Sequence, residues 1–133
     1  MQKVVVDTNI LVSALWSQRG NPYAVIELLL SEGLTLCYTD EIIEEYAEVL
    51  CREKFGFSKD NVDNLLREMI RNGIRSEHSI GTEAFTDETD RKFYDTAKAN
   101  DAILITGNMK HYPECPFVMT PLEFLHIYGL RES

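Results

Sequence analysis

The sequence predicts a single α/β domain built on a parallel sheet. Short runs of aliphatic and β-branched residues alternate with longer amphipathic segments, a pattern typical of parallel strands joined by helices that cover both faces of a sheet. The first run, Val4-Val5-Val6, ends at Asp7, which indicates a buried strand that carries an acid to the carboxyl end of the sheet. A length of 133 residues fits one core, so we assign residues 1–133 to a single domain.

The later elements are assigned from apolar spacing and from the residues that begin and end helices. After a short apolar segment over residues 10–16, Pro22 is placed to open a helix, and Thr39 or Asp40 is placed to cap the next one. The expected strands are residues 35–38, 74–80, 102–106 and a short one around 117–118. The expected helices are residues 22–30, 41 to about 54, 58 or 60 to a stop at Gly73, about 88–99, and one opened by Thr120-Pro121.

The net charge of the chain limits how it can bind nucleic acid. A formal net charge of −9 argues against broad electrostatic attachment to nucleic acid, so a bound nucleic acid requires a local basic rim or a bridging metal. Arg67, Arg71 and Arg75 are spaced to align along one helix face, although a solvated face explains the same spacing.

The cysteines and the first residues of the chain bear on the compartment. The three cysteines are odd in number and widely spaced, which predicts reduced, structurally buried thiols, and the histidines lack the spacing of a zinc site. The start of the chain lacks the apolar run of a signal peptide, and no segment is long enough to span a membrane. We therefore expect a cytoplasmic protein without a membrane partner.

Asp7 is the first candidate functional residue. Burying an aspartate costs free energy unless a cation or hydrogen-bond donors compensate it, and the adjacent Thr8 and Asn9 bring no positive charge. Glu45 is a possible companion, because it lies at the edge of the apolar arc of its predicted helix and can point along the core. The alternative is a boundary glutamate whose side chain extends into solvent.

Asp90 is a second possible companion, because Phe93, Tyr94 and Ala97 surround it on one apolar stripe of the predicted helix. The alternative is a capping box in which Asp87 caps the helix and Asp90 reaches back to it. By the same spacing, Lys92 is expected to point away, and Asp95 and Asp101 are expected to be solvated.

Asn108 follows the predicted strand 102–106. It forms either an ordinary Gly-Asn turn or a neutral oxygen ligand for Mg²⁺ or Mn²⁺. If Asp7, Glu45 and Asp90 meet, a divalent cation would relieve the repulsion among their three charges.

The order and spacing of these motifs, over nearly the whole chain, resemble those of PIN domains. The motifs are the hydrophobic-Asp-Thr-Asn start, Glu45 within Ile43 to Leu50, the pattern Asp87-x-x-Asp90-x-x-Phe93-x-x-x-Ala97, and Ile103 to Asn108. More narrowly, the chain resembles the VapC-like toxins of toxin–antitoxin pairs. The resemblance implies a three-layer α/β/α Rossmann-like fold with a central parallel sheet. It also implies a Mg²⁺- or Mn²⁺-dependent ribonuclease.

Carried over by position, Asp7, Glu45 and Asp90 match the metal-binding acids of the family. Asn108 falls where many members carry a further aspartate, and it completes the expected catalytic set. Side chains suited to orienting the ligands or the attacking water are those of Thr8, Asn9 and Thr106. The resemblance further implies an RNA substrate, which Lys110 is placed to contact, a cognate antitoxin and a homodimer.

Two other functions fit part of the pattern. A catalytically weak PIN-fold binding module is compatible with an asparagine at position 108. A Mg²⁺-dependent aspartyl-phosphate phosphatase also starts from an aspartate after a strand, but it requires a second aspartate two positions on, where this chain has Asn9.

Overall fold

The computed structural model of the chain describes residues 1–31 and 33–132. Its described residues form one sheet of five parallel strands, which confirms the predicted parallel sheet. The order of the strands is β3-β2-β1-β4-β5. The strands are β1 (Gln2–Val6), β2 (Leu34–Tyr38), β3 (Ile74–Arg75), β4 (Ile103–Ile105) and β5 (Val118–Met119). The central position of β1 places its carboxyl end in the middle of the sheet edge, where open α/β sheets bind ligands.

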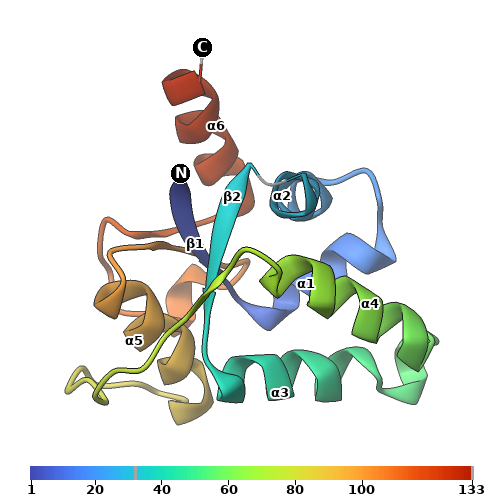
Figure 1. Cartoon of the computed structure of the whole chain (residues 1–133). Coiled ribbons are helices and arrows are strands. Elements are labelled where there is room, and N and C mark those ends of the chain that lie inside the picture. Colours follow the sequence, from blue (N-terminus) through green and yellow to red (C-terminus); the bar gives the residue numbers. More distant parts are fainter. Residues whose placement is uncertain (32, 133) are drawn as a thin grey trace.

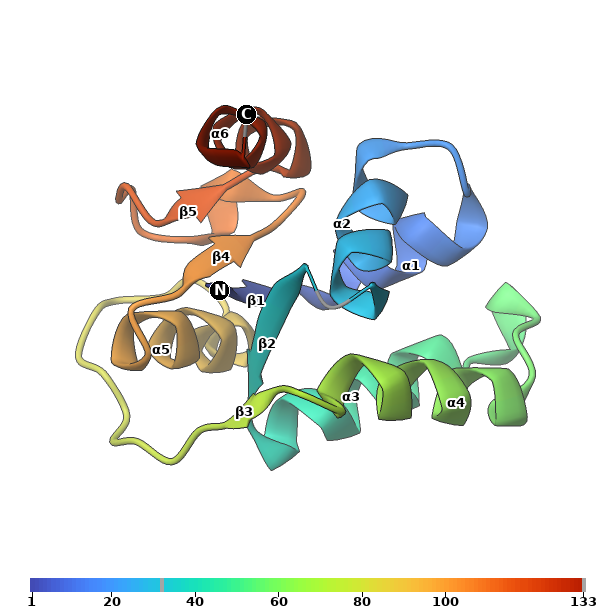
Figure 2. The ribbon, with the colours of Figure 1, turned by 45° about the horizontal axis from the view of Figure 1, so that its top comes forward.

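Helices cover both faces of this sheet and make the fold a three-layer α/β/α sandwich (Figures 1 and 2). Helix α5 packs on one face, and α1, α2 and α4 lie on the other (Figure 2). The described α-helices are α1 (Thr8–Trp16), α2 (Asn21–Leu30), α3 (Asp40–Leu50), α4 (Lys59–Ile70), α5 (Arg91–Ala99) and α6 (Pro121–Glu132). Three short 3₁₀ turns accompany them, namely η1 (Glu53–Phe55), η2 (Glu88–Asp90) and η3 (Met109–His111). No helix in this part of the chain is long and apolar enough to cross a bilayer.

The valines of β1 form the centre of the core. Val4, Val5 and Val6 are fully buried, as expected for a strand covered on both faces. The parallel register pairs Val6 with Ile105, so the residues that follow the two strands, Asp7 and Thr106, lie side by side. The register of the sheet therefore brings Asp7 and Thr106 together at the candidate site.

Most helix ends lie where the capping residues predicted them. Thr39 accepts a hydrogen bond from the amide of Ile42 at the start of α3, and Ser58 does the same for Asn61 in α4. The predicted helix 41–54 ends earlier, at Leu50, and η1 follows before Gly56 turns the chain with a positive φ of 71°. The apolar segment 10–16 forms the body of α1, whose N-cap is Asp7.

The predicted strand 74–80 is wrong beyond Arg75, because α5 holds the segment that follows. The guanidinium of Arg91 donates to the backbone carbonyls of Gly81 and Glu83, and Asp95 accepts from the amide of Gly81 at 3.0 Å. Asp95 is only 6% exposed, so the expectation of a solvated side chain is also wrong. Side-chain contacts to α5 replace the backbone ladder that a longer β3 would need.

Gly73, between α4 and β3, has no room for a side chain. A Cβ atom at this position would lie 2.8 Å from the carbonyl oxygen of Leu36 in β2. We expect Gly73→Ala to lower the free energy of unfolding by about 1–3 kcal/mol, the usual cost of overpacking. Urea denaturation measures the loss. The control is Gly129→Ala in α6, where a Cβ meets nothing within 4 Å, and which should be neutral or stabilising. Equal stability of the two variants would contradict the expectation.

Candidate metal centre

Asp7 is the buried carboxylate at the centre of the site. It is 7% exposed, and one oxygen, Oδ2, accepts hydrogen bonds from the Thr106 hydroxyl at 2.9 Å and the Tyr112 hydroxyl at 2.7 Å. Within the described residues, the other oxygen, Oδ1, accepts only from the amide of Asn9, at a long 3.4 Å. No basic side chain pairs with Asp7 among the described residues. One oxygen of this acid is therefore satisfied and the other is largely open.

Asp90 lies at the start of α5 and carries the second open oxygen. Its Oδ2 atom is buried, lies 3.5 Å from Nδ1 of His111, and has no hydrogen-bond partner within the described part of the chain. Burial, followed by repulsion from Asp7 and Asp87, raises the pKa of Asp90 above its ordinary value. The two acids are thus near enough to repel each other, and a cation would relieve both costs.

The capping alternative for Asp90 does not describe this helix start. Asp87 itself caps η2, because its Oδ1 accepts from both the amide and the hydroxyl of Thr89. These bonds lower the pKa of Asp87. Asp90 makes no side-chain cap of its own. Its carboxylate is left for another role.

Glu45 approaches the same region from α3 but has both oxygens in use. One accepts from the Thr8 hydroxyl, and the other lies 2.7 Å from the ammonium of Lys92 on α5. The expectation that Lys92 points away is wrong, since its side chain is only 9% exposed. Helix α3 packs against α5, and this contact turns Lys92 inward.

Hydroxyl and amide groups next to the acids orient them through hydrogen bonds. Thr106 is fully buried and bridges Asp7 to the amide of Asn108, and Asn9 accepts from the amide of Gly107 at 3.3 Å. Tyr112 was not anticipated from the sequence, where nothing in the loop around it indicates a buried hydroxyl. Burial and the nearby charge of Asp7 raise the pKa of Tyr112, so it stays protonated and donates to Asp7.

A family comparison matches this architecture. The family model described as "PIN domain" matches residues 3–110, which include β1, α3, α5 and β4. The chain belongs to the PIN domain family. PIN domains are generally metal-dependent nucleases, so this chain has a nuclease-type fold.

A relative with a similar sequence is an uncharacterized protein, MJ1680, from Methanocaldococcus jannaschii. It is 28% identical over 109 residues, which cover 80% of this chain and 70% of the relative. Its name assigns no activity. The family match over residues 3–110 identifies the PIN domain, and the chemistry follows from the side chains of the site.

The fit of a divalent cation rests on two of the three predicted acids. Asp7 and Asp90 each present an oxygen short of partners, whereas Glu45 is engaged by Thr8 and Lys92. No group of three or more Asp, Glu, His or Cys side chains is gathered as a ready metal site in the residues that the structure describes. Two hard oxygen donors still suit Mg²⁺ or Mn²⁺, which keep several waters in their coordination shells. The residues fit such an ion through Asp7 and Asp90.

Asn108 lies at the rim of this PIN domain site. It is exposed, and its side chain does not cap η3. It shares the end of β4 with Thr106, to which its backbone amide donates at 3.0 Å. Asn108 is therefore near the acids but adds no charge to them.

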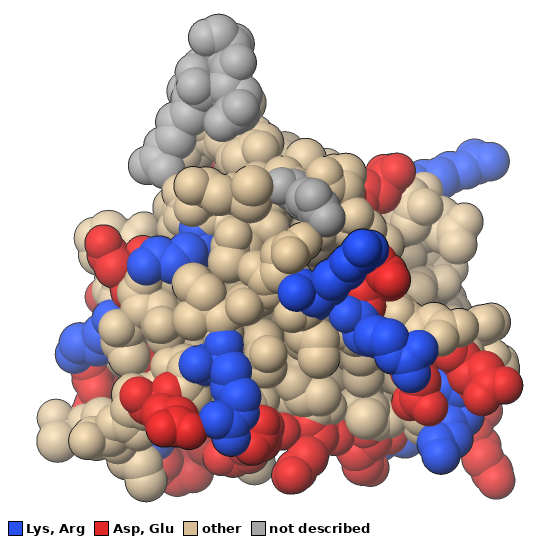
Figure 3. Space-filling model, in the orientation of Figure 1, with Lys and Arg blue, Asp and Glu red and all other residues tan. Residues whose placement is uncertain are grey.

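The three predicted arginines do not form a basic stripe. Helix α4 ends at Ile70, so Arg71 and Arg75 fall outside it. Arg71 pairs with Glu68, and Arg75 pairs with Asp40 and Glu77. On the face in Figure 3, basic and acidic side chains are interleaved. The cysteines are free, and of these Cys37 is buried as expected whereas Cys51 is exposed.

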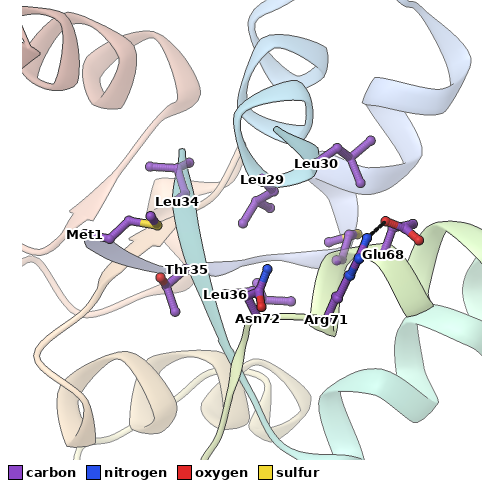
Figure 4. A pocket seen from close by; sticks show the side chains of 10 residues that line it. Met1, Leu29, Leu30, Leu34, Thr35, Leu36, Glu68, Arg71 and Asn72 are labelled. Carbon is purple, nitrogen blue, oxygen red and sulfur yellow. Dashed lines mark ion pairs between the residues drawn. The ribbon is translucent and has the colours of Figure 1, made fainter. Parts of the chain in front are cut away.

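A separate hollow, lined mainly by apolar side chains, is shown in Figure 4. It is lined by Leu29, Leu34, Leu36 and Met69, with the ion pair of Arg71 and Glu68 at its side. Leu34 opens β2, whereas Asp7 follows the end of β1. Because the strands are parallel, this hollow lies toward their amino ends, whereas Asp7 lies at their carboxyl ends. The hollow is therefore not part of the candidate metal centre.

The negative charge of Asp90 is expected to lower the stability of the metal-free PIN domain. A carboxyl whose pKa is raised by folding binds its proton more tightly when folded, so stability is lost as pH rises from about 4 through the raised pKa. We expect Asp90→Asn to raise the melting temperature in EDTA at pH 7 and to have little effect at pH 4. Calorimetry across this range measures the difference. A lower melting temperature at pH 7 would contradict it.

Proposed function

We propose that this PIN domain is a metal-dependent endoribonuclease that hydrolyses phosphodiester bonds. The observation that carries the proposal is the pair of carboxylates of Asp7, which is buried, and Asp90, whose Oδ2 atom is buried, each with an oxygen short of hydrogen-bond partners. Keeping such charges buried costs stability and is typical of functional sites.

In the proposed reaction, a water oxygen attacks the phosphorus and the bond to the leaving ribose oxygen breaks. Asp7 and Asp90 would hold a Mg²⁺ or Mn²⁺ ion, which when bound lowers the pKa of water and stabilises the charge on the phosphate oxygens. Thr106 and Tyr112 fix the Asp7 carboxylate by donating to its Oδ2. Thr8 holds Glu45 beside them. These contacts preorganise the acids.

A neutral groove beside the acids supports an RNA substrate. Its polar lining residues are Asn9, Ser13, Asn21, Asn108 and Thr120, and no Asp or Glu lines it in the part of the chain that the structure describes. Amides and hydroxyls donate to phosphate oxygens and to base edges. A chain of net charge −9 otherwise repels a polyanion, so an uncharged approach favours binding here.

The groove yields an expectation for Asn21→Asp. A new carboxylate in the wall should raise the KM for RNA severalfold and leave kcat unchanged, because it repels the strand without touching the acids. The fold should tolerate the change, since an acid suits the first turn of α2. The matched control is Asn64→Asp, at an exposed position of α4. A fall in kcat with unchanged KM would contradict this use of the groove.

The activity is tested with a labelled single-stranded RNA, with Mn²⁺ or Mg²⁺ and with EDTA. We expect cleavage only with the added ion. Because water is the proposed nucleophile, a substrate with 2′-O-methyl groups should still be cleaved and no 2′,3′-cyclic phosphate should form. Cleavage that persists in EDTA, or that stops on 2′-O-methylation, would overturn the proposal.

The engaged Glu45 and the neutral Asn108 favour one second candidate, a PIN-fold module that binds RNA and cleaves it weakly or not at all. Retention of the labelled RNA in a gel-shift assay without any cleavage in Mn²⁺ would support it. Metal-dependent cleavage would exclude it.

The finer biological role is proposed from the PIN family resemblance. In this role the protein is a VapC-like toxin in the cytoplasm, it forms a homodimer, and a small cognate antitoxin occludes its site. Exposed apolar side chains such as Trp16 and Leu122 are compatible with protein contacts. Growth arrest on expression, relieved by a small neighbouring gene, tests the toxin role, and size-exclusion chromatography with light scattering tests the dimer. No arrest would overturn the toxin role and leave the nuclease proposal standing.

A further inference from the structure

We propose that Lys92 is a built-in cation of the acidic site, which neutralises Glu45 so that the site takes one divalent ion, on Asp7 and Asp90, rather than two. This inference rests on the proposed metal-dependent function. It assigns to Lys92 a positioning role that the sequence pattern did not indicate.

The ammonium of Lys92 is buried by contacts from three directions. It lies 2.7 Å from Oε1 of Glu45 and donates to the carbonyl oxygen of Thr89, and it lies 5.0 Å from the ring centroid of Phe93. Its side chain is 9% exposed. A lysine with so little access to water requires a negative partner, and the carboxylate of Glu45 supplies it.

Each oxygen of Glu45 already has a donor, and the ammonium of Lys92 offsets its charge. The hydroxyl of Thr8 takes its second oxygen, so both oxygens of the carboxylate have a donor. Asp90 contrasts with it, because its buried Oδ2 has no hydrogen-bond partner among the described residues. Asp7 also keeps one oxygen with only a 3.4 Å contact. Two of the three acids are thus available to an ion, and the third is held by the chain itself.

The charges agree with a single ion. The carboxylates of Asp7, Glu45 and Asp90 carry three negative charges, and the ammonium of Lys92 removes one, which leaves the two that one divalent cation neutralises. Asn108 is neutral and exposed, so it supplies no further charge for a second ion. His111 lies near Asp90, but its side chain is largely exposed to solvent.

Counting bound Mn²⁺ by titration calorimetry, with electron paramagnetic resonance of the free ion as a second readout, tests the inference without RNA. We expect one equivalent for the natural protein and for Lys92→Arg, which keeps the positive charge. We expect two equivalents for Lys92→Met, which keeps the stem and frees Glu45. Lys98→Met is the matched control, because Lys98 is also on α5 and pairs with an acid, Glu83, outside the site.

A second variant keeps the test decisive if Lys92→Met does not fold. Glu45→Gln should still bind one Mn²⁺ within about tenfold of the natural affinity, the lower end of the effect of losing a supporting contact. Asp90→Asn should lose binding by more than about 100-fold, beyond the upper end of that range. Two equivalents on the natural protein, or loss of the ion on Glu45→Gln, would overturn the inference. One bound equivalent without RNA cleavage would overturn the proposed function and leave the role of Lys92 standing.

Discussion

Asp7→Asn is expected to reduce metal-dependent RNA cleavage by about 100- to 1,000-fold, the usual loss when a key electrostatic group of an active site is removed. The substitution removes the charge that would hold the ion and keeps the size of the side chain. Initial rates on labelled RNA in Mn²⁺ measure the effect, and most of it should appear in kcat.

Asparagine is as good an N-cap as aspartate, so the start of α1 keeps its acceptor, but the amide nitrogen then replaces the oxygen that accepts from Thr106 and Tyr112. Circular dichroism therefore has to show that the variant is folded before its rate is compared. The control is Asp101→Asn, an exposed position with a φ of 52° that asparagine adopts readily. Cleavage by Asp7→Asn at the rate of Asp101→Asn would remove Asp7 from the catalytic site.

Phe93→Ala is expected to lower the free energy of unfolding by about 3–5 kcal/mol, the cost of removing a buried aromatic ring from a core. Phe93 is 1% exposed and stacks with Tyr46 of α3 at 6.4 Å between ring centroids. This contact joins the two helices that bring Lys92 and Glu45 together. Because a domain of this size has only about 5–15 kcal/mol in total, the variant should be close to unfolding at 37 °C.

Urea denaturation of Phe93→Ala beside Phe55→Ala tests this expectation. Phe55 is a partly exposed ring in η1, so its truncation should cost clearly less. Equal losses for the two variants would show that the contact between α3 and α5 does not depend on the ring of Phe93.

Local pattern was sufficient for the fold and for two of the acids. The valine run that ends at Asp7 predicts a central buried strand, because only a strand covered on both faces is apolar throughout. The stripe of Phe93 and Ala97 predicted an inward-facing Asp90, because helical spacing fixes which residues share a face, and the structure has its side chain 15% exposed at the start of α5.

Contacts between segments that are far apart in the sequence could not be predicted from local pattern. Tyr112 donates to Asp7 across 105 positions in the chain, and Asp95 is buried because the segment at Gly81 folds over it. Helical rotation turned Lys92 away from the stripe, but a second helix, α3, supplies its partner on that side. A residue off the apolar face of its own helix is solvated only where no other element packs there.

By itself, the sequence determined the parallel α/β class and the acid at the end of the first strand, and it offered Glu45 and Asp90 as candidate companions, since apolar periodicity is a local property. Only the tertiary structure decided which carboxylate oxygens remain open. Glu45 is neutralised and Asp90 is not, because the packing of α3 against α5 joins one acid to a buried lysine and leaves the other without a donor.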